Sequence, residues 1–299
     1  MNVNKLQSAL DCIGYSGNTL SNEQWIVLHN ALTVLQTENH FKNVYLWGII
    51  QGQEADYYVA YGYEQDALFG QKYYYSNNLI DWGVLPTPTE KTMQLTELCQ
   101  LRFQGDPALV VEVIDDDPGP APEDIEKKKL EICLAGGDAA EIEALEKQYS
   151  TIETLKEEER LAATVGLINF DVVSVPRGAL MKLADGKVVV NLAFEGLPME
   201  ESQELKNYVH YRKPVQRWNT NLLTRKDYNY ALDFLDSVDI DLPKGCWSMQ
   251  YERGGKLSIL RNIYWIGYTG YHWNATPDWG YFYVGNGRKN WDVPFMIFS

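Results

Sequence analysis

The residue types that carry out most enzyme chemistry occur in this chain, but their spacing fits none of the common catalytic or metal-binding motifs. The histidines form neither an H-E-x-x-H motif nor any close pair, and the cysteines lack the C-x-x-C spacing of a zinc or redox site. These residues are His29, His40, His210 and His272, and Cys12, Cys99, Cys133 and Cys246. We therefore expect each histidine to be a structural or surface residue and the cysteines to be reduced core thiols.

No stretch of the chain fits a phosphate-binding loop, and one weak pattern points to cation binding. The stretch Gly285-Asn286-Gly287-Arg288 has the G-x-G of a dinucleotide loop without its third glycine, and no Walker-type loop or G-x-S-x-G serine is present. Asp236, Asp239 and Asp241 are close enough in sequence to hold a hard cation, yet the calcium loop with its central Gly and terminal Glu is absent. Solvated turn or capping residues are the better interpretation. The sequence predicts no catalytic, cofactor-binding or metal-binding residues, and hence no enzyme.

One alternative rests on aromatic rings beside acids, which together can form a sugar platform with two hydrolytic carboxylates about 5–10 Å apart. Ring-rich sheets, however, usually bury their rings in a core or in a protein interface. No pair of acids is singled out by its surroundings, so a carbohydrate-binding or carbohydrate-cleaving β-rich protein stays the second hypothesis.

The rings are concentrated in residues 242–299, which alternate aromatic and β-branched runs with Gly-rich turns. Residues 247–252 alternate with the period of two of a half-buried strand, and Gly254-Gly255 then marks a tight turn. A second strand is expected from Leu257 to Ile266 and a third at residues 281–284. The pattern predicts an antiparallel sheet rich in large rings.

The first part of the chain predicts helices followed by strands. Helices are expected at residues 4–13 and 21–38, the second opened by a capping box of Ser21 and Gln24. Strands are expected at residues 44–50, 57–61 and 72–76, and a further helix at 89–101.

The middle of the chain differs in composition. Residues 112–160 contain sixteen acidic and six basic residues, and we expect a solvated acidic insertion, with docking to a basic partner as the sharper alternative. Within it, helices are expected at 123–134, at 139–149 and from about Ser150. Strands at 167–175, 179–183 and 187–194 and a helix at 199–208 are expected to follow.

Together these patterns predict an α+β fold with N-terminal helices, antiparallel β meanders in both halves and an acidic helical insertion. The expected parts are residues 1–40, 41–108, 109–165 and 166–299. At 299 residues the chain is long enough for a large core, and its net charge of −15 argues against nucleic acid and against an anionic membrane surface. No apolar run is long enough to span a bilayer, and no signal peptide is evident, which together favour a cytosolic or cytoskeletal location.

Several short segments, in order along nearly the whole chain, resemble the radial spoke head protein 9 family of motile cilia and flagella. The matching segments are Trp47-Gly48, Ala55-Asp56-Tyr57-Tyr58-Val59-Ala60, Phe103-Gln104-Gly105-Asp106-Pro107, Pro176-Arg177-Gly178-Ala179-Leu180, Phe194-Glu195-Gly196-Leu197, Asp233-Phe234-Leu235-Asp236-Ser237, Pro243-Lys244-Gly245, Trp247-Ser248, Glu252-Arg253-Gly254 and Pro294-Phe295-Met296.

The resemblance implies a non-enzymatic structural subunit of the axonemal radial spoke head, without cofactors. It implies spoke head proteins of the 4 and 6 type as partners, contact with central-pair projections, and a part in mechanical signalling to the dyneins. Because the chain has 20 Tyr and 9 Trp, we expect some of these rings to be exposed on the free subunit and buried in the assembly.

Overall fold

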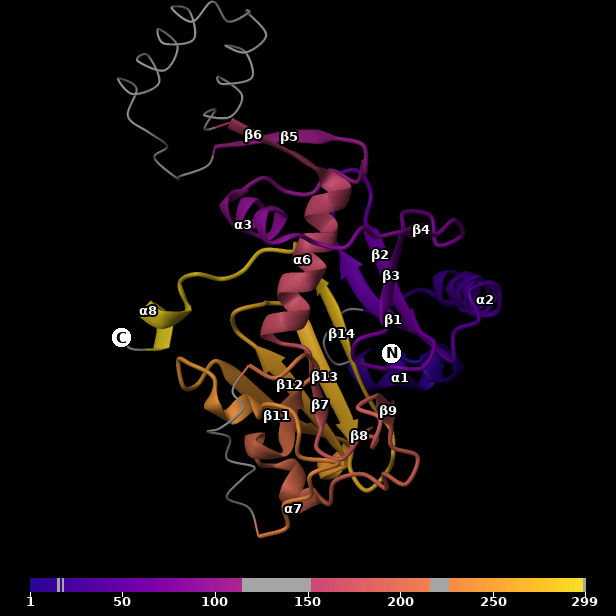
Figure 1. Ribbon diagram of the computed structural model, residues 1–299, viewed down its shortest axis with the longest axis vertical. Helices are drawn as coiled ribbons and strands as arrows, with labels where there is room; N and C mark the ends of the chain where they lie inside the picture. Colours follow the sequence, from indigo (N-terminus) through magenta and orange to yellow (C-terminus); the bar gives the residue numbers. More distant parts are fainter. Residues whose placement is uncertain (15–16, 18, 115–151, 216–225, 298–299) are drawn as a thin grey trace, which may run out of the picture. The chain divides into compact units, whose positions relative to one another are not determined.

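The computed structural model describes residues 1–14, 17, 19–114, 152–215 and 226–297 (Figure 1). They fall into two compact units, one formed by residues 1–86, 102–105 and 164–299 and the other by residues 87–101 and 106–163. The helices expected at 123–134 and 139–149 lie outside the described residues. The predicted α+β class is confirmed, and the part boundaries at 41, 109 and 166 stay a prediction.

The first unit is built on one eight-stranded sheet. Its strands, in spatial order, are β11 (Trp247–Glu252), β12 (Leu257–Asn262), β13 (Tyr268–Trp273), β14 (Trp279–Gly285), β1 (Asn43–Ile50), β2 (Tyr57–Tyr63), β3 (Lys72–Ser76) and β4 (Gly83–Val84). All neighbours pair antiparallel except β1 and β14, which run parallel and side by side (Figure 1). The two predicted meanders are therefore joined into a single mixed sheet.

The parallel junction requires a glycine. Gly48 lies opposite Tyr283, and a Cβ atom added at Gly48 would come within 2.2 Å of the Tyr283 carbonyl oxygen. Because backbone atoms of a central strand cannot move aside, no larger residue fits here. Strands β1 and β14 can pair at this position because residue 48 has no side chain.

One face of the sheet is covered by the N-terminal helices α1 (Leu6–Ile13) and α2 (Asn22–Glu38), which follow a short 3₁₀ turn at Val3–Lys5. The predicted capping box is confirmed, since the Ser21 hydroxyl accepts from Gln24 N and the Gln24 side chain accepts from Ser21 N at 2.9 Å. Leu28, Leu32 and Leu35 point from α2 into the aliphatic core.

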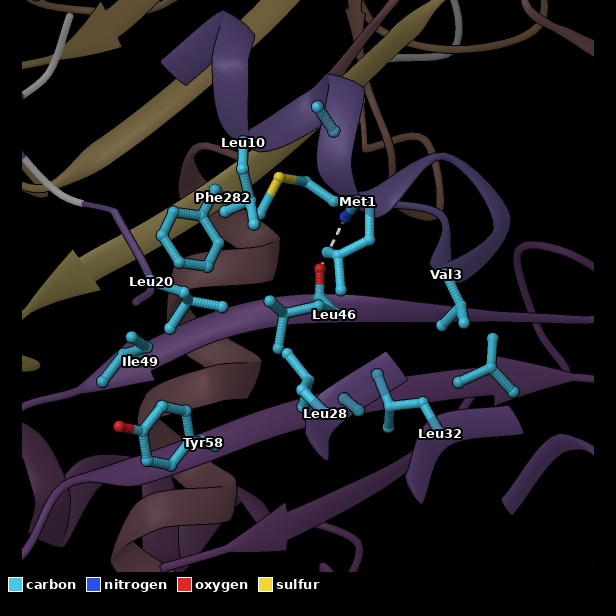
Figure 2. Close-up of a cluster of buried hydrophobic side chains, with 14 of the residues drawn as sticks. Met1, Val3, Leu10, Leu20, Leu28, Leu32, Leu46, Ile49, Tyr58 and Phe282 are labelled. Carbon is cyan, nitrogen blue, oxygen red and sulfur yellow. Dashed lines mark hydrogen bonds between the residues drawn. The ribbon is translucent and has the colours of Figure 1, made fainter. Parts of the chain in front are cut away.

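Met1 is part of that core. Figure 2 shows its side chain beside Leu10 and Phe282, with its amino group donating to the Leu46 carbonyl oxygen at 2.5 Å. A second carbonyl, that of Tyr281, lies 3.3 Å away. Burial without a charged partner lowers the pKa of this amine to about 5. The amine is therefore neutral at pH 7.

The opposite face of the sheet is a layer of tyrosines. Tyr61 is stacked on Tyr45 at 5.0 Å and on Tyr281 at 6.2 Å between ring centroids, and all three belong to central strands. Tyr61 and Tyr281 are 1% and 2% exposed. Because these rings face the interior, they cannot form the open sugar platform considered above.

Helix α6 (Glu157–Asp171) occupies residues where the sequence predicted a strand, and that prediction is wrong. The run at 167–175 is apolar enough for a strand, but Val165, Ile168 and Val172 are buried at the three- and four-residue spacing of a helix. Only β7 (Ser174–Pro176) remains extended, and it pairs with β10 (Tyr208–His210).

The second unit also corrects the prediction of a helix from Ser150. Residues Ile152–Lys156 form strand β6, which pairs antiparallel with β5 (Val110–Ile114), and the helix begins only at Glu157. Helix α3 (Glu90–Leu98), shorter than expected, contributes Leu95 to the small core of this pair.

The remaining elements are short. They are β8 (Leu180–Lys182), β9 (Val188–Val190), α7 (Met199–Ser202) and α8 (Val293–Ile297), with 3₁₀ turns at Leu205–Asn207, Val238–Ile240 and Arg253–Gly255. The helix expected at 199–208 is thus split into α7, a 3₁₀ turn and the start of β10, and β13 was not foreseen. None of the helices in the described ranges has the length and apolar character needed to cross a bilayer.

Candidate interaction surface

A cavity of about 340 Å³ opens beside the C-terminal segment of the first unit. It is lined by residues from five places in the chain: the end of α6, the segment from β10 to Arg212, residues 241–246 before β11, residues 262–264 at the end of β12, and residues 289–294. Large apolar side chains form its rim. Three of them, Phe170, Leu242 and Trp291, are 51%, 76% and 57% exposed.

Trp291 is held by a lysine and the lysine by an aspartate. The Lys289 ammonium lies 4.9 Å from the Trp291 ring centroid and 2.8 Å from Asp171 Oδ2. Trp265 Nε1 donates to the same carboxylate oxygen at 2.9 Å. A cation over an indole face is attracted to it, so this ion pair restricts an exposed ring before any partner arrives.

Phe170 is positioned in a similar way. The Arg212 guanidinium lies 4.5 Å from the Phe170 ring centroid, and its Nε donates to the Phe170 carbonyl oxygen at 2.7 Å. Arg212 also pairs with the buried Asp236 carboxylate at 3.0 Å. The second rim ring is thus stacked under a fixed cation.

Helix α8 contributes Pro294 to the cavity lining and carries further exposed apolar side chains. Val293 is fully buried and anchors the helix, while Phe295 and Met296 are 78% and 60% exposed. We call Phe170, Leu242, Trp291, Phe295 and Met296 the aromatic surface. Large exposed rings held in place by their neighbours are the usual anchors of protein interfaces, because little conformational entropy is lost when a partner covers them.

The floor of the cavity contains a buried histidine. His210 Nε2 lies 3.0 Å from both oxygens of Asp241, which also accepts from Trp247 Nε1 at 2.8 Å. His210 Nδ1 has no hydrogen-bond partner among the described residues. Cys246 lines the same cavity, but burial raises the pKa of its thiol to about 11, so it is protonated at pH 7 and a poor nucleophile.

The three aspartates considered as cation ligands are used separately. Asp236 pairs with Arg212 and Asp241 with His210, while Asp239 accepts from the Ser237 hydroxyl at 2.5 Å. Within the described ranges, no group of three His, Cys, Asp or Glu residues is placed to hold a metal ion. The structure gives these acids roles in local packing.

The other histidines and cysteines are dispersed. His272 is fully buried; its Nε2 accepts from Leu197 N at 3.0 Å, and burial lowers its pKa to about 4. His29 is on α2 and His40 follows that helix. Cys12, Cys99 and Cys246 are free thiols, and Cys133 lies outside the described residues.

Most of the rings that the sequence offered as interface anchors are internal. Among the described residues, Trp291 is the one exposed tryptophan, and the exposed tyrosines are Tyr228, Tyr230 and Tyr251. Composition alone does not indicate that Trp291 is exposed while Trp265 is buried. Leu242 and Phe170 were missed because single apolar residues beside loops carry no periodic signal.

Comparison with known proteins assigns the chain to a family. Residues 1–72 match a family model described as radial spokehead-like protein. The chain is 39% identical over 299 residues to the radial spoke head protein 9 homolog of Danio rerio, covering 99% of this chain and 100% of the relative. It is 37% and 36% identical to the homologs of Bos taurus and Homo sapiens, each over 297 residues with the same coverage. The chain belongs to the radial spoke head protein 9 family.

Proposed function

We propose that this chain is a structural subunit of the axonemal radial spoke head in motile cilia or flagella. In this role it supports assembly of the head and transmits mechanical signals between the central pair and the dyneins. The observation that carries the proposal is the identity of 35–39% to radial spoke head protein 9 homologs over 99% of the chain. Location in the axoneme is part of the same proposal.

We further propose that the aromatic surface is where another spoke head protein, of the 4 or 6 type, docks. The surface supports this because two of its exposed rings, Trp291 and Phe170, are held by Lys289 and Arg212 respectively. Covering apolar area stabilises a complex by about 25 cal/mol per Å² before association costs, so a few large rings supply much of the affinity.

The proposed function is non-enzymatic. The polar groups nearest to a catalytic arrangement are bound to one another: Asp241 is held by His210 and Trp247, and the Cys246 thiol is kept protonated by burial. A nucleophile needs an adjacent base and a lowered pKa, and Cys246 has the opposite shift.

Co-expression with spoke head proteins of the 4 and 6 type tests the docking proposal. We expect the chain to co-elute with one of them in gel filtration. Separate elution of all chains, with each one folded, would refute it.

A further inference from the structure

We propose that a second cavity of this chain, beside the aromatic surface, binds an acidic segment of a partner protein. This cavity has a volume of about 710 Å³ and lies between the end of β14, residues 51–56 and residues 286–290. Its lining includes the basic residues Arg102, Arg288 and Lys289 and a single acidic residue, Asp56. We call it the basic cavity.

Two of these cations have no partner within the described part of the chain. Arg102 and Arg288 are exposed and form no ion pair or side-chain hydrogen bond with any described residue. The chain has 41 acidic and 26 basic residues, yet neither of these two arginines is paired with one of its described carboxylates. Lys289 is occupied by Asp171, and the Asp56 carboxylate accepts from Gly52 N at 3.2 Å.

The backbone holds both arginines in place. Phe103, next to Arg102, is fully buried, and its carbonyl oxygen accepts from Gln53 N at 2.8 Å. Before Arg288, Gly287 has φ of 68°, and a Cβ atom there would lie 2.9 Å from the Phe103 ring. The Gly285–Arg288 stretch, which fits no phosphate loop, is thus a tight turn that packs on the neighbour of Arg102.

The chemistry of the lining fits carboxylates. A guanidinium offers donors in a fork that matches a carboxylate, and the side-chain amides of Gln51 and Asn286 add further donors. Ile266, 66% exposed, also lines the cavity and offers an apolar contact. These features favour a Glu- or Asp-rich segment that includes an apolar side chain.

The chain's own net charge of −15 opposes an acidic ligand at long range. That repulsion is screened beyond a Debye length of about 8 Å at physiological salt. A carboxylate in contact with the two guanidinium groups is much closer to them than this length, so their attraction is screened less. The local cations therefore decide the sign of the interaction, and binding should weaken as salt rises.

The basic cavity and the cavity beside the aromatic surface have one lining residue in common, Lys289. The inference does not depend on spoke head function, because it concerns a peptide ligand and this chain alone. A variant that loses peptide binding but still binds a spoke head partner, or the reverse, distinguishes the basic cavity from the aromatic surface.

The test measures binding of a fluorescein-labelled peptide, EEEELEEEE, to the full chain by fluorescence anisotropy, with QQQQLQQQQ as the uncharged peptide. We expect only the acidic peptide to bind, and its affinity to fall at least tenfold between about 50 mM and about 500 mM salt. Reversing both charges (Arg102→Glu with Arg288→Glu) should weaken binding by roughly tenfold or more, and Arg102→Gln with Arg288→Gln by less.

The matched control reverses two exposed lysines elsewhere, Lys42→Glu with Lys256→Glu, which changes net charge equally. We expect this variant to bind the peptide within about threefold of the unmodified chain, since both sites lie outside the cavity. Equal losses in the two double variants would overturn the proposal in favour of non-specific attraction. Displacement of the peptide by inorganic phosphate at equal concentration would overturn it in favour of a small-anion site.

Discussion

Lys289 and Asp171 form an ion pair of 2.8 Å that joins the C-terminal segment to the end of α6. Both side chains are only about a fifth exposed, at 20% and 23%, so water screens the pair less than a surface bridge. Trp291 rests on the lysine of this pair. The exposed ring is therefore attached to the fold through a fixed charge, which is what an interface anchor requires.

Replacing Trp291 by Ala should weaken binding to a spoke head partner by about tenfold or more while changing the free energy of unfolding by less than about 1 kcal/mol. The ring is 57% exposed, so the fold loses little buried area. The control is Tyr230→Ala, which removes an exposed ring outside the aromatic surface, 73% exposed. Gel-filtration titration and urea unfolding give the two quantities, and equal effects of the two variants on binding would contradict the assignment.

Replacing Asn169 by Ala should lower the free energy of unfolding by about 2–3 kcal/mol. Asn169 accepts from Trp47 Nε1 at 2.7 Å and donates to the Tyr73 hydroxyl at 2.9 Å, so its loss leaves a buried indole N–H unsatisfied. Asn30→Ala on the exposed side of α2 is the matched control and should have little effect. Urea denaturation measures both, and similar values would argue against the bridge.

Replacing Gly48 by Ala should destabilise the fold by about 3 kcal/mol or more, or prevent folding, because the new methyl group would meet the backbone of β14. Gly14→Ala tests whether any glycine replacement does the same. There the nearest atom is 3.9 Å away and φ is −52°, so we expect no loss of stability. A Gly48→Ala protein as stable as Gly14→Ala would show that the strands are not paired as described.

Stability should fall as the solution is acidified from pH 6.5 to pH 4. Burial lowers the pKa of His272 from 6.5 to about 4, so in this range the unfolded chain binds a proton that the folded chain does not. The contribution of His272 to stability is complete above pH 6.5 and declines by up to about 3 kcal/mol toward pH 4.

His272→Gln isolates this effect, because glutamine keeps a donor and an acceptor without titrating. Urea unfolding at several pH values should show a shallower decline for the variant than for the unmodified chain. The pKa of the Met1 amine is lowered to about 5, so this group also reduces stability as the pH falls from 8 to 5. Its contribution is the same in both proteins. Identical pH profiles would contradict the assignment to His272.

Local signals in the sequence predicted local structure well. The Ser21–Gln24 capping box marked the start of α2, and the strand expected at residues 72–76 is β3. The pairing of Gly48 with Tyr283 joins residues far apart in the chain, and nothing in either segment indicates the other. For that reason two meanders were predicted where one sheet forms.

Helix α6 shows a second limit. A short apolar run fits a buried strand and a buried helix equally well, and tertiary contacts decide between them, here Asn169 with Trp47 and Tyr73. The aromatic surface shows a third limit of sequence-based prediction. Trp265 is buried and Trp291 is exposed, but their sequence contexts do not indicate this difference. Family membership was indicated by the ordered motifs, whereas the interface residues needed the structure.

The most direct test of the proposed function is affinity purification of the tagged protein from salt-extracted axonemes, with mass spectrometry of the proteins that co-purify. We expect the other spoke head subunits to be recovered with it. Recovery of the chain alone, or its absence from axonemes, would contradict its assignment as a spoke head subunit.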